Sequence, residues 1–333
     1  MLTSLILQLN SPNEADLPAS LGRAGQALLL QFIGARDPAL AESLHNLDGP
    51  KPFTVSNLVL GKRQQGSLHL QAGQSGWLRF TGLSREVSRH LLALAANPPA
   101  TITLAGQILQ VTGATLDPAG HPWAGQASYQ DLAAPFLLGG QGRPAARISL
   151  DFASPTTFKS QGRYVPLPLP ELVFGSLLDR WQAFAPIALH PEVRRFAQEA
   201  VVLSRYHLRS RGLPAKEGGP QIGVTGQATK TALNRDHRYW LNVLHLLAAF
   251  AFYSGVGYQT GAGLGQTRAI VNRQSSIVNR QCLHSTWLNK GPKFIRNTAG
   301  WWSKRMSRSC RASPCSKSTR CSSLATWALL LRP

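Results

Sequence analysis

The spacing of apolar residues along the first 112 positions predicts a series of short strands and helices. Strands are expected at Leu2–Leu9, Lys51–Leu60 and Thr101–Thr112, and a hairpin from Ser67–Gln71 and Gly76–Phe80. Helices are expected over Ala19–Asn46, broken at Asp37-Pro38, and over Ser84–Ala96, which Ser84 caps. The order β, α, β, α, β with one extra strand is close to a ferredoxin-like unit.

A second series of elements repeats this order. Strands are predicted at Ala145–Phe152, Val201–Arg211 and Pro220–Lys230, and helices at Pro170–Phe184 and Tyr239–Tyr253. We therefore predict an α+β protein with two tandem ferredoxin-like domains, residues 1–125 and 145–268. Residues 126–144, rich in small and polar residues, are expected to connect them. Residues 269–333 are expected to form an irregular C-terminal tail.

The stretch Ser254–Arg268, SGVGYQTGAGLGQTR, follows the last predicted helix and is called the glycine-rich loop below. Its five glycines can take positive φ and allow close approach of another molecule; they are Gly255, Gly257, Gly261, Gly263 and Gly265. Their amides can line an anion site, so we expect a phosphate-rich ligand. The alternative is a structural turn and strand at the end of a domain. Neither a dinucleotide motif nor a Walker loop fits, because Thr260 replaces a required glycine and no lysine lies in the loop.

The charge balance points to a polyanionic partner. The 333 residues carry a net charge of +20 and are 43% hydrophobic, which favours a folded protein that binds nucleic acid or an anionic surface. Residues 269–333 hold twelve Lys and Arg and no acidic residue, which leaves 23 basic and 15 acidic residues, or +8, over 1–268. This moderate charge, without a basic amphipathic helix, argues against a membrane-surface binder. No signal peptide is visible at Met1–Asn10, so we expect a cytoplasmic protein.

The tail differs from the rest of the chain in its composition. It opens with the repeat IVNRQSS–IVNRQ and holds all four cysteines: Cys282, Cys310, Cys315 and Cys321. One interpretation is a basic RNA-binding arm with Cys282 and His284 as metal ligands. We favour the other, translated sequence outside the ancestral frame, because the spacing matches no thiolate metal site. The histidines of the main body also lack metal-ligand spacing, so no metal and no cofactor are predicted.

Three stretches, taken in order, resemble a known family. They are LHNLDGPKPFTVSNL (residues 44–58), LDFASPTTFKSQGRYVPLPLPELVFGSLLDRW (150–181) and the glycine-rich loop. Together they resemble the CRISPR-associated endoribonucleases of the Cas-six type, within the RAMP superfamily, from residue 1 to about 268. The resemblance implies two RRM/RAMP-type domains, binding of CRISPR repeat RNA as precursor and mature guide, and a CRISPR effector complex as a further partner. It also implies metal-independent cleavage, in which the ribose 2′-OH attacks the adjacent phosphate and leaves a cyclic phosphate.

The same resemblance suggests catalytic roles for two residues. His45 follows the first helical segment, where the family commonly carries a catalytic histidine, and histidine exchanges protons near neutral pH. The alternative is a helix-terminal histidine favoured by the helix dipole. Lys51 is expected to neutralise a phosphate oxygen, or else to be a solvated lysine at the start of a strand. Some relatives use a tyrosine in the first helix; this chain has Phe32 there and no Tyr, so a third catalytic residue is not identified.

The remaining expected RNA contacts are basic or glycine positions. They are the five glycines of the glycine-rich loop together with Arg268, Lys159, Lys230, Arg235 and His237. For His237 a helix-capping segment around Asp236 is an equal explanation. The competing function is a catalytically inactive RNA-binding RAMP subunit of an effector complex, which would share the fold and the basic surface. Cleavage of repeat RNA in EDTA distinguishes the two.

Overall fold

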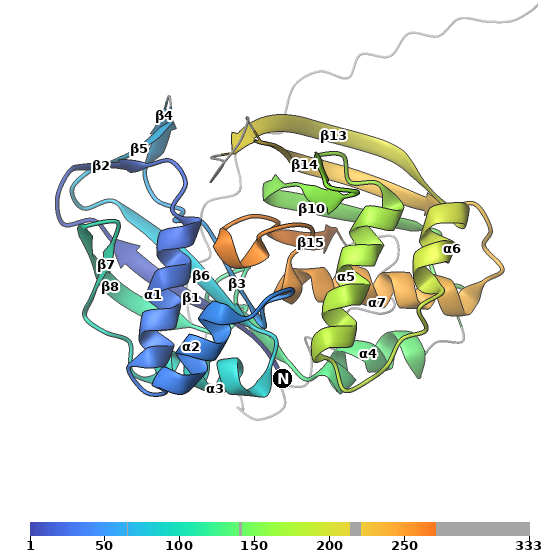
Figure 1. Cartoon of the computed structure of the whole chain (residues 1–333), viewed down its shortest axis with the longest axis horizontal. Helices are drawn as coiled ribbons and strands as arrows, with labels where there is room; N and C mark the ends of the chain where they lie inside the picture. Colours follow the sequence, from blue (N-terminus) through green and yellow to red (C-terminus); the bar gives the residue numbers. More distant parts are fainter. Residues whose placement is uncertain (65, 140–141, 214–220, 271–333) are drawn as a thin grey trace, which may run out of the picture. The chain divides into compact units, whose positions relative to one another are not determined.

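The computed structural model describes residues 1–64, 66–139, 142–213 and 221–270 (Figure 1). The predicted tail lies outside the described residues from position 271 onward. None of the helices in the described ranges is long and apolar enough to cross a membrane.

The N-terminal half is built on an antiparallel sheet of order β3-β6-β1-β8-β7, with β9 also paired to β1. The strands are β1 (Leu2–Asn10), β3 (Phe53–Val55), β6 (Ser75–Gly82), β7 (Thr101–Leu104), β8 (Gln107–Thr115) and β9 (Gly125–Ala127). Helices α1 (Gly22–Gly34) and α3 (Arg85–Ala96) pack on this sheet with the apolar faces that their periodicity predicted. Their buried contributions to one shared core are Leu28, Leu29, Ile33, Val87, Leu91 and Leu94.

The break predicted at Asp37-Pro38 is confirmed. Helix α2 (Pro38–Asn46) starts there, with the Asp37 carboxylate accepting from the Leu40 amide at 2.9 Å and proline in the first turn. Ser84 caps α3 in the same way, through the Val87 amide at 3.3 Å. Such capping residues are strong predictors of a helix start, because each side chain accepts a hydrogen bond from an amide that the helix itself leaves without a partner.

Two strand predictions in this half differ from the structure. The strand expected at Lys51–Leu60 is only β3, because regular pairing with β6 stops after Val55. Beyond it the chain forms single bridges, from Ser56 to Gly263 and from Val59 to Trp77 of β6. The predicted hairpin was wrong. Its first strand, β5 (Ser67–Leu70), pairs with β2 (Ala15–Pro18) and β4 (Lys62–Gln64), whereas both edges of β6 are occupied by β1 and β3.

The C-terminal half has its own antiparallel sheet, of order β13-β14-β10-β15. The strands are β10 (Arg147–Thr156), β13 (Val201–Leu213), β14 (Gln221–Ala232) and β15 (Thr267–Ile270), with a separate hairpin of β11 (Phe158–Ser160) and β12 (Arg163–Val165). The helices are α4 (Tyr129–Leu137), α5 (Pro170–Phe184), α6 (Val193–Ala200) and α7 (Arg238–Ser254). Trp181 of α5 is fully buried and contacts the rings of Tyr129 and Phe250 edge-on, with centroids 5.3 and 5.2 Å away. Two ferredoxin-like units in tandem are thus the observed fold.

Helix α4 lies within the segment predicted as a connection. Ser128 caps it by accepting from the Asp131 amide at 2.9 Å, and Tyr129 and Ala133 are buried in the C-terminal core. Pro135 lies inside the helix, and its presence in a run of small residues hid the helical pattern.

A buried arginine ties the two halves together beside the glycine-rich loop. Arg79 of β6 donates to Ser4 Oγ at 2.8 Å and to the carbonyls of Trp123 and Phe252 at 3.1 and 2.5 Å. Its guanidinium also lies 4.6 Å from the Phe252 ring centroid. Burial lowers the pKa of Arg79 to about 9, which still leaves it charged at neutral pH. The end of α7, and the glycine-rich loop that follows it, are therefore fixed against the N-terminal sheet.

Candidate functional site

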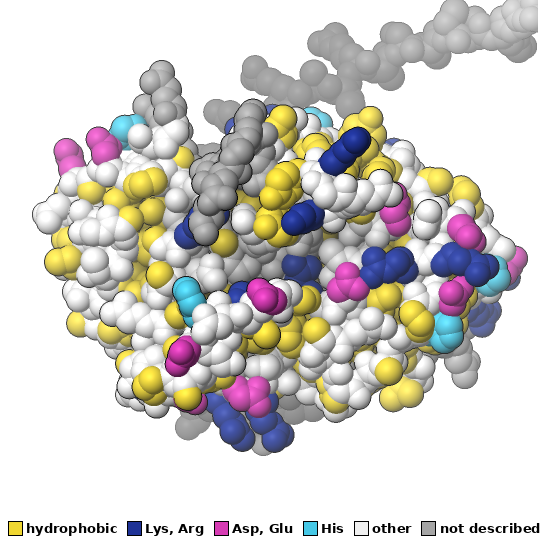
Figure 2. All heavy atoms as spheres, in the orientation of Figure 1, with side chains coloured by type: hydrophobic (Ala, Val, Ile, Leu, Met, Phe, Trp, Pro, Cys, Tyr) yellow, Lys and Arg dark blue, Asp and Glu magenta, His cyan; other side chains and the backbone are white. Residues whose placement is uncertain are grey.

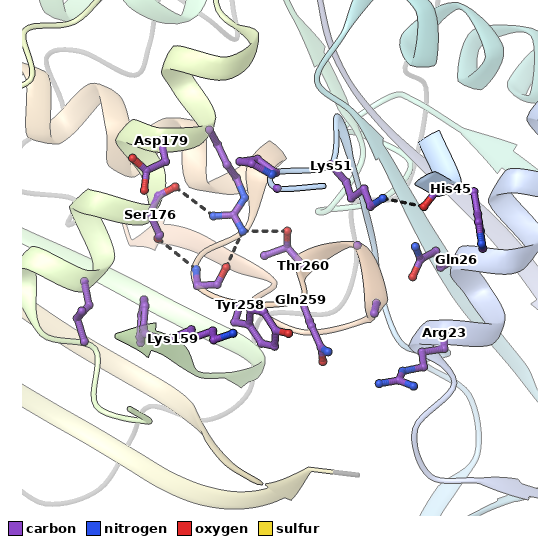
Figure 3. A pocket seen from close by; sticks show the side chains of 18 of the residues that line it. Arg23, Gln26, His45, Lys51, Lys159, Ser176, Asp179, Tyr258, Gln259 and Thr260 are labelled. Carbon is purple, nitrogen blue, oxygen red and sulfur yellow. Dashed lines mark hydrogen bonds between the residues drawn. The ribbon is translucent and has the colours of Figure 1, made fainter. Parts of the chain in front are cut away.

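A cleft of about 870 Å³ brings several of the predicted residues together. Its walls come from α1, α2, residues 49–51, β11, α5, α6 and the glycine-rich loop (Figure 3). Five predicted site residues line it: His45, Lys51, Lys159, Gly257 and Gly261. Figure 2 shows Lys and Arg side chains gathered in the middle of this face of the molecule. The cleft is thus assembled from segments more than 200 residues apart in sequence.

His45 is exposed in the last turn of α2. Lys51 comes back to this helix end, where its ammonium donates to the carbonyls of Leu44 at 2.8 Å and His45 at 3.1 Å, and also to that of Leu47. A cation at a helix C-terminus satisfies carbonyls that have no amide partner and complements the dipole. Burial lowers the pKa of Lys51, and nearby Asp48 acts in the opposite direction. Lys51 therefore holds the turn that carries His45, and its donors are already used.

The glycine-rich loop folds on itself and on its neighbours, and many of its amides donate hydrogen bonds within the protein, which makes those amides unavailable to an anion. The amides of Val256, Tyr258 and Gly265 donate to the carbonyls of Gly265, Thr157 and Pro155 at 2.8, 2.8 and 3.0 Å. The Gly257 and Gln266 amides donate to Ser176 Oγ and Ser154 Oγ at 3.2 and 2.8 Å. The loop presents Gly257, Gly261 and the side chains of Tyr258 and Gln259 to the cleft.

Close internal packing explains the glycines at two positions. Gly257 has φ +84°, and a Cβ there would lie 2.4 Å from the Thr157 carbonyl oxygen. Gly265 has φ +71°, and a Cβ there would lie 2.1 Å from the Val256 carbonyl oxygen. Such contacts are far inside van der Waals distance, so the loop needs glycine for its own fold.

Arg180 of α5 lines the cleft and holds this loop in place through hydrogen bonds. Its guanidinium donates to the carbonyls of Ser176 at 3.1 Å and Gly257 at 2.5 Å, and to Thr260 Oγ1 at 3.3 Å. Burial lowers the pKa of Arg180 to about 10, so it stays charged at neutral pH. Asn57 provides a second tie, because its carboxamide accepts from the Leu21 amide at 2.9 Å and donates to the Gly263 carbonyl at 3.1 Å. The start of α1 and the loop are thereby joined.

Most of the charged residues that line the cleft are cationic. Its Lys and Arg residues are Arg23, Lys51, Lys159, Arg180 and Arg194, against the two acidic residues Glu171 and Asp179. Arg194 pairs with Asp179 at 2.5 Å. Arg23, in the first turn of α1, and Lys159, on β11, are exposed and form no ion pair within the described ranges. These two cations are the ones free to meet an anionic ligand.

The other predicted contacts lie away from the cleft. Lys230 on β14 is fully buried, with its ammonium 4.9 Å from the Phe152 ring centroid, so it presents no charge to a phosphate at the surface. Arg268 pairs with Asp151 at 3.2 Å and lies over Trp123. Arg235 and His237 are exposed just before α7, where the His237 ring contacts Phe196 at 5.9 Å. Gly255 and Gly265 pack against other residues of the loop, whereas Gly263 packs against Gly22 and Asn57 of the N-terminal half.

Sequence reasoning missed Arg23, Gln26, Tyr258 and Arg180 as cleft residues. Arg23 and Gln26 lie three residues apart on α1, which is one face of a helix, but nothing in that helix alone marks the face as functional. Within the described ranges, no three His, Cys, Asp or Glu side chains group closely enough to hold a metal ion.

Comparisons with known proteins match both halves of the chain to the same family. The family description "CRISPR Cas6 N-terminal domain" matches residues 1–134, and "CRISPR-associated endoribonuclease Cas6" matches residues 150–267. A Mycobacterium tuberculosis protein named CRISPR-associated endoribonuclease Cas6 is 32% identical over 130 residues, which are 38% of this chain and 40% of that protein. The matched part thus spans less than half of that curated relative.

Solved structures cover more of the molecule. A Thermus Cas6 product complex is 30% identical with a TM-score of 0.62, and covers 81% of this chain and 99% of its own. A second product complex, of a Thermus thermophilus Cas6, is 27% identical with a TM-score of 0.64, and covers 81% of this chain and 100% of its own. Both halves of the fold are therefore shared with these proteins.

Proposed function

Because the chain belongs to the Cas6 family of CRISPR-associated endoribonucleases, we propose that it binds CRISPR repeat RNA in this cleft and cuts it there. The observation that carries the proposal is His45, exposed at the end of α2 and lining a cationic cleft. Solved relatives that are product complexes, and one that is a substrate-mimic complex, support RNA as the ligand. A CRISPR effector complex is the partner that we propose for the processed guide RNA.

The proposed reaction is an internal transesterification. The ribose 2′-OH attacks the neighbouring phosphate, and the 5′-oxygen leaves, which yields a cyclic phosphate and a 5′-hydroxyl. This chemistry needs a group to accept the 2′-OH proton, a group to protonate the leaving oxygen and a cation to stabilise the charge on phosphorus. It needs no metal ion.

Three residues of the cleft fit these needs differently. His45 is proposed for proton transfer, because imidazole exchanges protons near neutral pH. Arg23 is proposed as the cation on the phosphate, because its guanidinium is exposed in the cleft and has no acidic partner there. Lys51 is proposed to act through α2, since its ammonium is bonded to the carbonyls that end this helix.

A second basic surface supports binding of a longer RNA. The alternating exposed residues of β13 on the sheet face away from the helices are Arg205, His207, Arg209 and Arg211. Their spacing of two puts all four side chains on one face. Contacts of this kind bind phosphates without reading sequence.

Single-turnover cleavage of the repeat RNA from the same genome tests the proposal. His45→Ala should slow cleavage about 10²–10⁴-fold, the usual loss for a general acid or base, with little change in repeat affinity. His69→Ala is the control, because the His69 side chain is 44% exposed and pairs with Asp16 on β2–β5, outside the cleft. Cleavage should persist in EDTA and stop when the scissile nucleotide lacks its 2′-OH.

Each failure has a defined meaning. A His45→Ala protein as fast as its parent removes His45 from the reaction. Loss of cleavage in EDTA removes the metal-independent mechanism. A parent protein that binds the repeat tightly but never cuts it is the inactive RNA-binding subunit instead.

A further inference from the structure

One tyrosine that lines the cleft and a second tyrosine in contact with it have no part in the proposed reaction. Tyr258 lines the cleft, and its ring centroid lies 5.6 Å from that of Tyr164, with 51° between the ring planes. Tyr164 belongs to β12 and is 48% exposed. We propose that Tyr164 and Tyr258 form a stacking platform for an unpaired nucleobase of the RNA, next to the phosphate held in the cleft. This inference rests on the proposed function.

The Tyr164 side of the platform is held by a tight hairpin. Gln161 and Gly162 connect β11 to β12 with φ of +49° and +75°, the pattern of a two-residue type I′ turn. In this hairpin Lys159 lies directly opposite Tyr164. Side chains directly opposite in an antiparallel pair share one face. The exposed ring is therefore presented together with an ammonium that forms no ion pair in the described part of the chain.

The Tyr258 side is held by the glycine-rich loop. The Tyr258 amide donates to the Thr157 carbonyl at 2.8 Å, and Gly257 lets the loop approach this carbonyl closely. Because Thr157 immediately precedes β11, the same corner of the chain positions both rings. A platform fixed on both sides loses little conformational freedom when a base stacks on it.

The surroundings favour a nucleotide as the occupant. Figure 3 shows Lys159 and Tyr258 on the wall across the cleft from Arg23 and Gln26. A base on the rings would leave its phosphate near Lys159, which is exposed and has no acidic partner among the described residues. The phenol of Tyr258 raises the pKa of Tyr164, so Tyr164 is neutral at neutral pH and does not repel a phosphate. Aromatic rings beside cations are the usual way in which proteins hold single-stranded RNA.

Fluorescence of 2-aminopurine tests the platform separately from cleavage. The probe is the repeat RNA with a 2′-deoxy scissile nucleotide and 2-aminopurine placed in turn at the positions on either side. In the parent protein one position should be quenched on binding. Tyr164→Ala should abolish this quench and weaken Kd about 5- to 150-fold, the effect of losing one stacked base. Tyr164→Phe should keep both the quench and the affinity, because the ring remains.

Tyr239→Ala is the matched control, since Tyr239 is 50% exposed and also contacts one aromatic ring, that of Trp240, yet lies outside the cleft. A Tyr164→Ala protein that keeps the quench and the affinity overturns the platform. So does a Tyr164→Phe protein that loses both, because the hydroxyl would then be what matters. Since this RNA is not cut, a catalytic failure of His45 leaves the result readable. A parent protein that does not bind the repeat at all overturns both proposals.

Discussion

The ammonium of Lys51 is bonded to carbonyl oxygens and is not left free for a phosphate. Three backbone carbonyls at the end of α2 surround it. A lysine that contacted a phosphate would contribute to RNA binding in both the ground and the transition state. A lysine that holds a helix end would affect only the placement of His45, and therefore the rate.

We expect Lys51→Met to slow single-turnover cleavage about 10- to 100-fold, because a displacement of about 1 Å of a catalytic group has effects of this size. The Kd for the non-cleavable repeat should change by less than about twofold. Lys51 makes no contact with a phosphate on this account, so its replacement removes no RNA contact. Lys51→Arg should restore most of the rate, because guanidinium also donates to carbonyls. An affinity loss in Lys51→Met that equals its rate loss would instead place Lys51 on the RNA.

The residues of the cleft differ in how far the sequence alone could identify them. His45 and Lys159 were predicted because they lie in short motifs whose order along the chain is characteristic. Arg23 and Tyr258 were not, because the cleft that gives them meaning forms only when α1 packs beside the glycine-rich loop. Lys51 was found, but its hydrogen bonds to the helix end are a tertiary fact that spacing does not contain.

At the scale of elements, the composition located the glycine-rich loop but left open whether its glycines approach a phosphate or pack within the protein. Glycine density indicates close approach, but it does not say to what. Here the close neighbours are the protein's own carbonyls at Thr157 and Val256. Substitution in this loop should therefore damage folding first, and RNA binding as a consequence.

Gly265→Ala tests this reason. It adds left-handed strain of about 1–2 kcal/mol and a collision with the Val256 carbonyl, which costs about 1–3 kcal/mol more through backbone shifts. The control is Gly73→Ala, because Gly73 has nearly the same φ, +76° against +71°, with no atom within 4 Å of the added Cβ. Urea unfolding should show a loss for Gly265→Ala at least about 1 kcal/mol larger than for Gly73→Ala. Equal losses would mean that the loop relaxes and that its glycines have another purpose.

Helices were easier to predict than strand partners for a related reason. Capping residues and 3.6-residue periodicity are local, and they located α2, α3, α5 and α7. Strand pairing is not local: β5 and β6 are neighbours in sequence, yet they belong to different sheets. Only the packing of the whole N-terminal core selects β1 and β3 as the partners of β6.

At the scale of the whole molecule, the position of each charge matters more than the net charge. The sequence predicted a basic protein that binds a polyanion, and it counted Lys230 among the contacts. In the structure Lys230 is enclosed in the C-terminal core, opposite Ile148 and Leu203 on the neighbouring strands. Its ammonium has no hydrogen-bond partner among the described residues. A charge there affects the stability of the fold and not the binding of RNA.

The stability of the protein should therefore depend on pH through this lysine. Burial lowers the pKa of Lys230 from its usual 10.5 to about 7 in the folded protein. Between these values the unfolded chain binds the proton and the folded protein does not, so the free energy of unfolding rises with pH from about 7 to about 10.5. Below pH 7 both states are protonated and this contribution is constant. At about 1.4 kcal/mol per pKa unit, the cost of the buried charge is a few kcal/mol.

Lys230→Met should remove this cost, raising the free energy of unfolding near pH 7 and flattening its rise towards pH 10. Urea unfolding at several pH values measures both effects, with Lys62→Met as the control because Lys62 is exposed on β4. The comparison between the two variants cancels the titration of all other groups. If the two variants show the same slope between pH 7 and 10, the ammonium of Lys230 is not buried without a partner in solution. The C-terminal core around Lys230 would then have to admit water, or provide a hydrogen-bond partner, so that the protonated ammonium does not destabilise the fold.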